Sequence, residues 1–234
     1  MLRKILSFFF PNPCVVCGRA AGKDRFVCRR CEDTPIYIGR NSVCRTCFES
    51  IPTDVSYCPR CLLLKPKYDR LVACAKYSGK LRWSVYRFKF CNRPDFGESF
   101  ALMMQKRLSE FNLSGFDCVV PVPMTKKQVM ARGYNQSEIL AQKLSYLINT
   151  ECIPHALYKT RETKRQSLLK SDEREANVRG VFKLTDHRLI SNKRILLVDD
   201  IVTTGATVRE VSRVLSRYAK SVTVCTVSKT VLKR

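Results

Sequence analysis

The stretch Ile195-Leu-Leu-Val-Asp-Asp-Ile-Val-Thr-Thr-Gly-Ala-Thr207 joins an apolar run to two adjacent acids and a hydroxyl-rich turn. The run predicts a buried strand that ends at the acids, and the turn predicts a tight loop that opens a helix. Backbone amides at a helix N-terminus, with hydroxyls beside them, form a cradle for an anion. Two carboxylates suit a sugar diol because each accepts hydrogen bonds from hydroxyl groups. We therefore expect this stretch to bind a phosphorylated pentose.

Around this stretch, the chain after residue 70 alternates short apolar runs with amphipathic segments. We predict strands over 71–77, 117–122, 153–158, 181–184, 194–199 and 221–227, and helices over 96–108, 136–147 and 207–218. A further helix is indicated by the spacing of Leu81, Val85 and Phe88, and residues 62–69 form a linker. The alternation is typical of an α/β domain with a mainly parallel sheet. Ligands bind such sheets at the carboxyl ends of the strands, here the loops after Val122, Tyr158 and Asp200.

Eight of the thirteen cysteines form four Cys-x-x-Cys pairs that repeat with a period of 30 residues. Each half of this repeat supplies four thiolates, the number that a tetrahedral structural zinc requires. The spacing favours sequential pairing within each half and leaves a cross-brace open. Disulfides, an iron–sulfur cluster and a redox motif are the alternatives. We predict two structural Zn²⁺ ions, bound by Cys14, Cys17, Cys28 and Cys31 and by Cys44, Cys47, Cys58 and Cys61.

The formal net charge is +23, from 43 Lys and Arg against 20 Asp and Glu. This excess favours a polyanionic partner: nucleic acid, a phosphate-rich ligand or an anionic membrane surface. A general solubility effect is the alternative. No run of 18 apolar residues occurs, and the short apolar run within Met1–Phe10 stops at Pro11 without a cleavage site. We predict a cytoplasmic protein with no membrane span.

The segment Lys76–Phe90 interleaves cations with aromatic side chains, as in grooves that hold single-stranded nucleic acid. Leu81, Val85 and Phe88 are expected to face the core. Packing is the alternative role for each aromatic residue. The surface candidates for contact with nucleic acid are Arg82, Trp83, Tyr86, Arg87 and Lys89.

The motif Arg132-Gly-Tyr-Asn-Gln136 follows a predicted strand end. A guanidinium and two amides there are suited to a pyrophosphate, which makes Arg132, Asn135 and Gln136 candidates. The alternative is a polar helix start that Asn135 caps. The polar stretch from Tyr158 to Asn177, with Lys159 and Lys164, fits a mobile lid over the phosphates or a solvated loop.

The stretch that ends at Thr207 resembles the phosphoribosyl pyrophosphate signature of the type I phosphoribosyltransferase family. The resemblance implies that Asp199 and Asp200 bind the ribose hydroxyls, that Mg²⁺ accompanies the pyrophosphate, and that the 5-phosphate is held by Thr203, Thr204, Gly205, Ala206 and Thr207. Hypoxanthine–guanine members carry an acid where Thr203 stands. Threonine moves no proton at neutral pH, which argues against a 6-oxopurine acceptor.

Three further motifs resemble the ComF competence family: Phe10-Pro-Asn-Pro-Cys-Val-Val-Cys17, Val120-Pro-Val-Pro123 with Arg132-Gly-Tyr-Asn-Gln-Ser137, and Arg161-Glu-Thr-Lys-Arg-Gln-Ser-Leu168 with Gly180-Val-Phe182. This resemblance implies a double zinc ribbon over residues 1–65 and a phosphoribosyltransferase-like domain over 70–234. It also implies natural transformation, with single-stranded DNA, a competence helicase or DNA-processing proteins as partners. The oligomeric state stays open, and a homodimer is one expectation.

Three functions are consistent with these features. The first is a competence-associated protein that binds phosphoribosyl pyrophosphate and single-stranded DNA. The second is an active phosphoribosyltransferase that acts on an amine or a nucleobase and releases pyrophosphate. The third is a sensor that binds the sugar phosphate without turnover. The charge and the zinc ribbons favour the first, and no general base or acceptor pocket is evident from the sequence.

Overall fold

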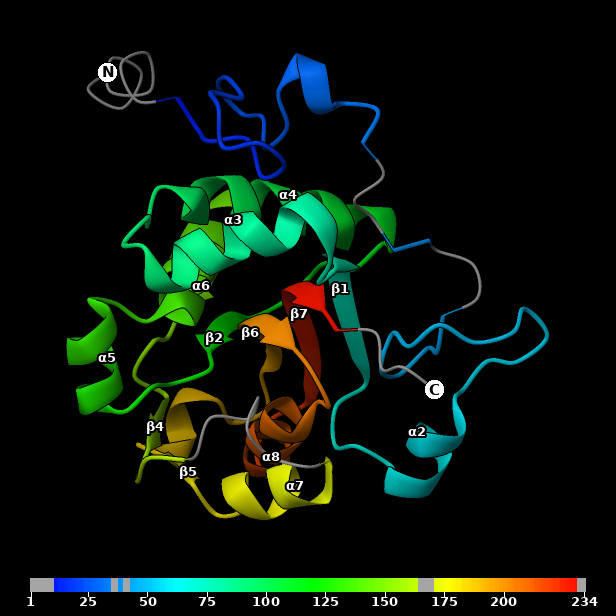
Figure 1. The fold of residues 1–234 in the computed structure, drawn as a ribbon. Helices are drawn as coiled ribbons and strands as arrows, with labels where there is room; N and C mark the ends of the chain where they lie inside the picture. Colours follow the sequence, from blue (N-terminus) through cyan, green and yellow to red (C-terminus); the bar gives the residue numbers. More distant parts are fainter. Residues whose placement is uncertain (1–10, 35–37, 40–42, 164–170, 231–234) are drawn as a thin grey trace.

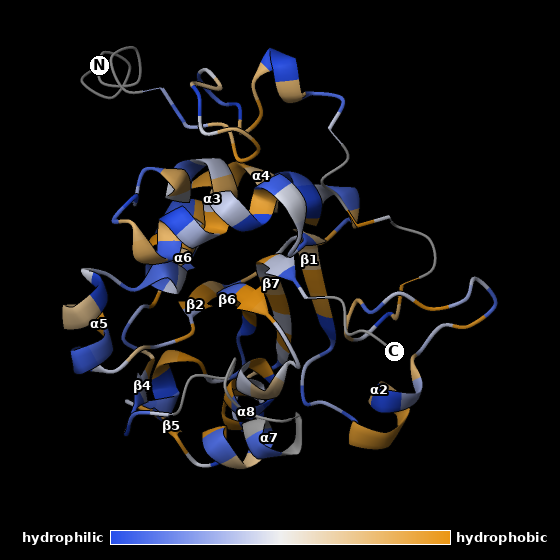
Figure 2. Ribbon diagram, in the orientation of Figure 1, coloured by the Kyte–Doolittle hydropathy of each residue, from blue (hydrophilic) through white to orange (hydrophobic). Residues whose placement is uncertain are grey.

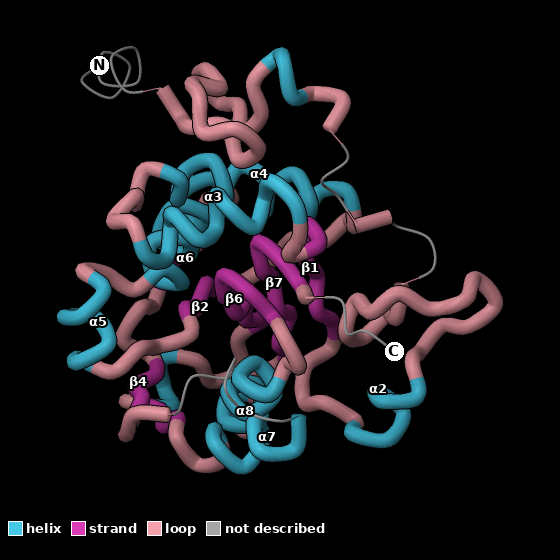
Figure 3. The backbone as a smooth tube through the Cα atoms, viewed as in Figure 1, coloured by secondary structure: helices cyan, strands magenta, loops and turns pink. Residues whose placement is uncertain are grey.

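A five-stranded parallel sheet forms the centre of the molecule, whose computed structural model describes residues 11–34, 38–39, 43–163 and 171–230. The strand order is β1-β7-β6-β2-β3, and every neighbouring pair is parallel. The strands are β1 (Arg70–Lys76), β2 (Cys118–Pro121), β3 (Glu151–Cys152), β6 (Arg194–Val202) and β7 (Ser221–Lys229). Figure 3 shows the strands between two groups of helices. This arrangement confirms the predicted α/β class with a parallel sheet.

Helices cover both faces of the sheet, which explains the unbroken apolar runs of its central strands. One face carries α3 (Gly79–Phe90), α4 (Phe96–Glu110) and α6 (Gln136–Leu147), and the other carries α7 (Ser171–Val178) and α8 (Ala206–Leu215) (Figure 1). Along β6 the side chains alternate between two cores: Ile195 and Leu197 belong to one, and Leu196 and Val198 to the other. Figure 2 shows apolar residues concentrated in the sheet and on the helix faces toward it.

The predicted strand over 153–158 is wrong, because the chain divides it between two sheets. β3 ends at Cys152, and a turn at Pro154 and His155 follows. Proline has no amide hydrogen and cannot continue the hydrogen-bonded ladder. β4 (Leu157–Lys159) then pairs antiparallel with β5 (Phe182–Leu184) in a separate two-stranded sheet.

Four further elements differ from the sequence-based expectation. β6 continues to Val202, so the two acids lie within the strand and not at its end. α5 (Lys126–Arg132) occupies a predicted loop, where Thr125 and Gln128 form a capping box. α7 occupies the last part of the predicted lid, and Lys164 lies outside the described residues. α2 (Pro59–Leu64) extends into the predicted linker.

Two similar modules precede the sheet, and their backbone contacts repeat with the 30-residue period of the cysteines. The bridge Pro13–Ala20 corresponds to the bridge Val43–Ser50. The amide of Cys14 donates to the carbonyl of Arg19 at 2.6 Å, and the amide of Cys44 donates to the carbonyl of Glu49 at 2.8 Å. The internal duplication inferred from the sequence is therefore a structural one.

Each module gathers four cysteine sulfurs within 4.8 Å of one another. The first set is Cys14, Cys17, Cys28 and Cys31, and the second is Cys44, Cys47, Cys58 and Cys61. The Sγ–Sγ distances of 3.7 Å for Cys17–Cys28 and 3.6 Å for Cys47–Cys58 are close to the ~3.8 Å edge of a tetrahedral zinc–thiolate site. The donor sets fit zinc, and the pairing is sequential.

Both modules are packed against the sheet domain. Cys14, Val15 and Val16 of the first share a core with α3 and α4. Phe48 of the second belongs to the opposite core and makes an edge-to-face contact with Phe111 at 5.3 Å. The domain division at residues 65–70 stays a prediction, but apolar packing is continuous across it.

Backbone of the second module and of the segment that precedes it lies along the outer edge of β1. The amide of Leu71 donates to the carbonyl of Thr46 at 2.7 Å, and the amide of Ile38 donates to the carbonyl of Cys74 at 3.3 Å. The buried guanidinium of Arg107 donates to the carbonyl of Ile38. This edge of the sheet is therefore occupied by the chain's own backbone. Within the described part of the chain, no helix combines the length and the apolar character needed to cross a membrane.

We predict that the purified protein contains two zinc ions per chain. The variants Cys28→Ser and Cys58→Ser should each reduce the content to one, because each removes a single thiolate from a different four-cysteine set. Elemental analysis measures the content. The matched control is Cys91→Ser, an exposed thiol outside both sets, which should retain two ions. A wild-type content of one zinc would contradict the two-site assignment.

Candidate functional site

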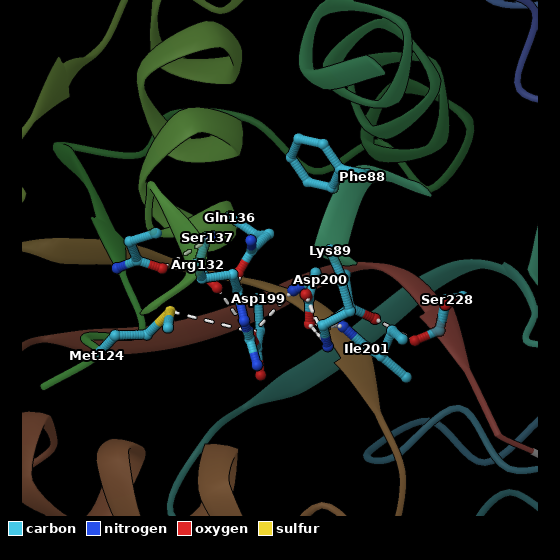
Figure 4. Close-up of polar contacts among 12 residues, drawn as sticks. Phe88, Lys89, Met124, Arg132, Gln136, Ser137, Asp199, Asp200, Ile201 and Ser228 are labelled. Carbon is cyan, nitrogen blue, oxygen red and sulfur yellow. Dashed lines mark hydrogen bonds and ion pairs between the residues drawn. The ribbon is translucent and has the colours of Figure 1, made fainter. Parts of the chain in front are cut away.

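The two acids lie in the second half of β6, where three hydrogen bonds hold their side chains. Asp199 Oδ1 accepts from the Ser137 hydroxyl at 2.9 Å and from the amide of Asp200 at 2.9 Å. Asp200 Oδ1 accepts from the amide of Ile201 at 2.6 Å. Figure 4 shows Ser137 approaching Asp199 from the start of α6. The pair is held rigidly at the carboxyl side of the sheet, where the topology predicts a ligand site.

Lys89 forms an ion pair with Asp200. Its Nζ lies 2.8 Å from Oδ2 and 3.0 Å from Oδ1, and the two side chains are only 18% and 8% exposed (Figure 4). The sequence analysis placed Lys89 on a surface for nucleic acid. The structure turns it toward the acids instead, because it lies near the end of α3 on the side that faces β6. Lys89 and Asp200 are 111 residues apart in sequence, so no local sequence pattern predicts their contact.

Among the described residues, Asp199 forms no ion pair of this kind. Burial, followed by the negative charge of Asp200, raises the pKa of Asp199 to about 7. Lys89 and the hydrogen bond from Ser137 act in the opposite direction and do not cancel this effect. Near neutral pH the carboxyl group of Asp199 therefore exchanges a proton, and a cation at this place would favour its charged form.

The loop after β6 turns sharply into α8. Gly205 precedes α8 with φ +79°, and an added Cβ would lie 2.9 Å from Arg209 Nη1. Arg209 Nη1 donates to the carbonyl of Thr204 at 2.7 Å. The Thr204 hydroxyl is buried and has no hydrogen-bond partner among the described residues. The loop and the first turn of α8 bring together all five predicted residues, Thr203, Thr204, Gly205, Ala206 and Thr207.

The residues predicted to bind pyrophosphate, Arg132, Asn135 and Gln136, follow β2, which is the neighbour of β6 in the sheet. Arg132 Nη1 donates to Gln136 Oε1 at 3.0 Å, while the buried Gln136 Nε2 has no partner within the described ranges. Asn135 has the structural role that the sequence left as an alternative: it accepts from the amide of Ser137 and donates to the carbonyl of Val122, both at 3.1 Å. Arg132 and Gln136 therefore retain more capacity for a ligand than Asn135 does.

A cation that the sequence analysis placed in the lid belongs to this region. Lys159, on β4, donates to the Thr163 hydroxyl at 2.9 Å. Burial lowers the pKa of Lys159; the nearby charge of Glu162 acts against this, and the like charges of Arg132 and Arg161 lower the pKa further. Lys159, Arg132 and Arg161 repel one another, so this group of cations is electrostatically suited to a polyanion.

The sequence analysis did not identify Ser137 as a partner of Asp199, although Ser137 belongs to the motif that begins at Arg132.

The aromatic surface of α3 is partly used in packing. Leu81, Val85 and Phe88 are buried, as predicted. Trp83 is 45% exposed, and a Cβ at Gly18 of the first zinc module would lie 3.0 Å from its ring. The guanidinium of Arg87 lies 4.5 Å from the centre of the Trp83 ring. Tyr86 and Arg82 are exposed. A role in nucleic-acid binding for this helix stays a prediction.

The fold and the two four-cysteine sets agree with two family matches. Residues 129–230 match the phosphoribosyl transferase domain, and residues 5–62 match the double zinc ribbon domain. The protein is thus a phosphoribosyltransferase-type α/β domain that carries an N-terminal double zinc ribbon with two structural zinc sites. The modules that contain the first and second four-cysteine sets are hereafter the first and second zinc ribbons.

Relatives with known names narrow the class. The chain is 30% identical over 210 residues to the DNA utilization protein YhgH of Escherichia coli O157:H7, with 87% of this chain and 84% of that protein covered. It is 27% identical over 212 residues to Competence protein F of Haemophilus influenzae, with 82% and 91% covered. The chain belongs to the ComF family, as the motifs indicated. A purine phosphoribosyltransferase structure from Pyrococcus horikoshii Ot3 shares 16% identity, covers 56% of this chain and 80% of its own, and has a TM-score of 0.33.

We predict that Asp199→Asn makes the protein relatively more stable as the pH rises. With its pKa raised above that of the unfolded chain, Asp199 binds a proton more tightly in the native state, so wild-type stability falls as the pH rises through 7. Asparagine removes this loss. The variant's free energy of unfolding, relative to wild type, should rise by about 1 kcal/mol between pH 6 and pH 8. Urea denaturation measures it, and a difference independent of pH would show that Asp199 is already ionised.

Proposed function

We propose that this protein binds phosphoribosyl pyrophosphate with Mg²⁺ and binds single-stranded DNA, and that it acts in natural transformation. One observation carries the sugar-phosphate part: the acid pair of β6, half-buried Asp199 and buried Asp200, leads directly into a loop whose Thr204 hydroxyl is buried without a partner among the described residues. An unpartnered buried hydroxyl is costly, and a phosphate oxygen would satisfy it. The acids beside it suit the ribose hydroxyls.

The cations around the acid pair support a pyrophosphate group. Arg132 and Lys159 lie close enough for their charges to interact unfavourably. A polyanion between them would relieve this repulsion and accept hydrogen bonds from both. Gln136 would add a third donor, because its buried Nε2 is unpartnered among the described residues.

The donor set also fits Mg²⁺, which prefers carboxylate and phosphate oxygens. Asp199 would hold the ion, since its two hydrogen bonds both reach Oδ1 and leave Oδ2 available. The bound ion would supply charge neutralisation for the pyrophosphate. Lys89 holds Asp200 in place through their ion pair. The raised pKa of Asp199 implies that a proton and a metal ion compete for this carboxylate.

The DNA part of the proposal is supported by charge and by the relatives. The chain carries a formal net charge of +23, which two four-thiolate zinc sites lower only to about +19. Its relatives include proteins named for DNA utilization and for competence. Partners of the same process, a helicase or DNA-processing proteins, are the expected protein contacts.

Turnover as a phosphoribosyltransferase is a second candidate, favoured by the titration of Asp199 near neutrality. A carboxyl group with such a pKa can carry a proton during group transfer. A pyrophosphate-release assay with ammonia, amines and nucleobases distinguishes turnover from binding alone. Release that persists in Asp199→Asn would exclude this carboxyl group as the proton carrier.

We predict that Thr204→Val weakens the binding of phosphoribosyl pyrophosphate about tenfold without lowering stability. Valine has nearly the same shape, and the hydroxyl that it removes makes no hydrogen bond among the described residues, so the cost falls on the ligand. Isothermal titration calorimetry in the presence of Mg²⁺ measures the affinity. Thr185→Val, at a position away from the loop, is the control. Equal affinities for Thr204→Val and wild type would remove this hydroxyl from the ligand site.

We predict that single-stranded DNA binds with a strong dependence on salt. Neutralised phosphates release counterions, so four to six contacts should weaken binding roughly 50- to 300-fold between about 50 and 200 mM salt. Fluorescence anisotropy with a labelled oligothymidylate measures the dissociation constant. Affinity that does not change over this range, or an absence of binding, would refute the DNA part of the proposal.

A further inference from the structure

A cavity of about 600 Å³ lies between the second zinc ribbon and the sheet domain. Its size is within the range of pockets that hold small organic groups. The ribbon side includes the apolar residues Ile51, Pro52, Val55, Tyr57, Leu62 and Leu64, together with Glu49, Ser50 and Arg60. The domain side includes Tyr68, Leu71 and the loop residues Thr204 and Gly205. One wall of the cavity is therefore the candidate phosphate loop itself.

A second cavity of about 590 Å³ continues the first, since both are lined by Leu64, Pro66 and Arg209. Together they form one groove, hereafter the ribbon groove, with an apolar end beneath the second zinc ribbon and a cationic end over α7 and α8. In Figure 1, α2 lies on the same side of the molecule as α7 and α8, separated from them by the chain that leads to β1. The basic residues of the cationic end are Lys65, Lys67, Arg179, Arg209 and Arg213.

The acids of the groove are already neutralised. Glu175 pairs with Arg209 at 2.5 Å, and Glu210 pairs with Arg213 at 2.7 Å. At the apolar end, Glu49 pairs with Lys229 at 2.8 Å.

Three cations of the groove have no such partner. Lys65, Lys67 and Arg179 are exposed and form no ion pair within the described part of the chain. The cationic end therefore presents uncompensated positive charge to solvent.

The apolar end is open and carries an aromatic side chain. Tyr57 is 42% exposed, Val55 is 41% exposed and Leu62 is 60% exposed. Exposed apolar groups around a cavity mark a binding surface more often than scattered surface residues do. An aromatic ring at such a place provides a platform for stacking.

We propose that the ribbon groove binds single-stranded nucleic acid, with one unstacked base in the apolar end against Tyr57 and the adjoining phosphates on Lys65, Lys67 and Arg179. Adjacent apolar and cationic ends match the alternation of base and phosphate along a single strand. An acidic peptide would use the cations but would leave the apolar cavity beneath the ribbon unfilled. This proposal rests on the DNA-binding part of the proposed function and does not depend on the sugar-phosphate part. It places the DNA contact at the second zinc ribbon and not at α3.

The charge arm of the test compares two triple variants of equal charge by anisotropy with labelled oligothymidylate. Lys65→Ala/Lys67→Ala/Arg179→Ala should weaken binding about 10- to 100-fold and lower the salt slope by about 2. The matched control is Lys183→Ala/Arg217→Ala/Lys220→Ala, which removes exposed cations outside the groove. It should change binding by less than about threefold. Equal losses in both variants would mean non-specific attraction and would overturn the proposal.

The stacking arm tests the apolar end. Tyr57→Ala should weaken binding about tenfold because one stacked base is lost, whereas Tyr57→Phe should bind as wild type does. Tyr218→Ala, at a tyrosine of similar exposure outside the groove, is the control. Wild-type affinity for Tyr57→Ala would overturn the assignment of a base to this cavity.

Protection of lysines in the wild-type protein gives a measurement that needs no variant. Bound oligothymidylate should protect Lys65 and Lys67 from acetylation, and Lys183 and Lys220 should stay reactive. Wild-type protein that binds no DNA at all would refute the DNA part of the proposed function. A different result would be that Arg82→Ala/Trp83→Ala abolishes DNA binding while Lys65 and Lys67 stay unprotected. That result would support the DNA-binding function and refute the ribbon groove as its site.

Discussion

Two adjacent carboxylates in a buried parallel strand repel each other, and the surrounding structure is arranged to hold them. Lys89 of α3 neutralises Asp200, and Ser137 of α6 donates to Asp199. The acid pair thus ties two helices of one face to the central strand. Asp199 forms no ion pair among the described residues, and burial together with the charge of Asp200 raises its pKa to about 7. A site that leaves this imbalance is poised for a cation or for hydroxyl donors from a ligand.

The two zinc ribbons pack against opposite faces of the sheet domain. Each contributes apolar residues to a different core: Val15 and Val16 of the first lie with α3 and α4, and Phe48 of the second lies in the core on the other face. Phe48 has φ +62°, where the equivalent residue of the first ribbon is Gly18 with φ +76°. A bulky residue in this conformation is strained, and its complete burial against Phe111 is what compensates the strain. The duplicated modules have therefore diverged to fit different surfaces.

Much of this could be predicted because the signals were local. The Cys-x-x-Cys period, the apolar run before Asp199 and the boundaries of α6 depend on residues close in sequence, and the structure agrees with each. The ion pair of Lys89, the partner of Asp199 on α6 and the groove beneath the second ribbon join residues far apart in sequence. The turn at Pro154 and the capping box at Thr125 follow from local turn and cap chemistry, which the pattern of apolar residues does not reveal. Tertiary contact, not propensity, decided the remaining differences.

The backbone contacts along β1 link zinc binding by the second ribbon to protection of the sheet edge. An open edge strand exposes unpaired amides and carbonyls that recruit strands from other molecules. Here Thr46, one residue from the ligand Cys47, and Ile38 occupy that edge through hydrogen bonds to Leu71 and Cys74. Loss of the metal from the second ribbon would destabilise this cover and expose the edge of β1. Zinc depletion would then promote self-association, because the exposed edge of β1 is a template for aggregation.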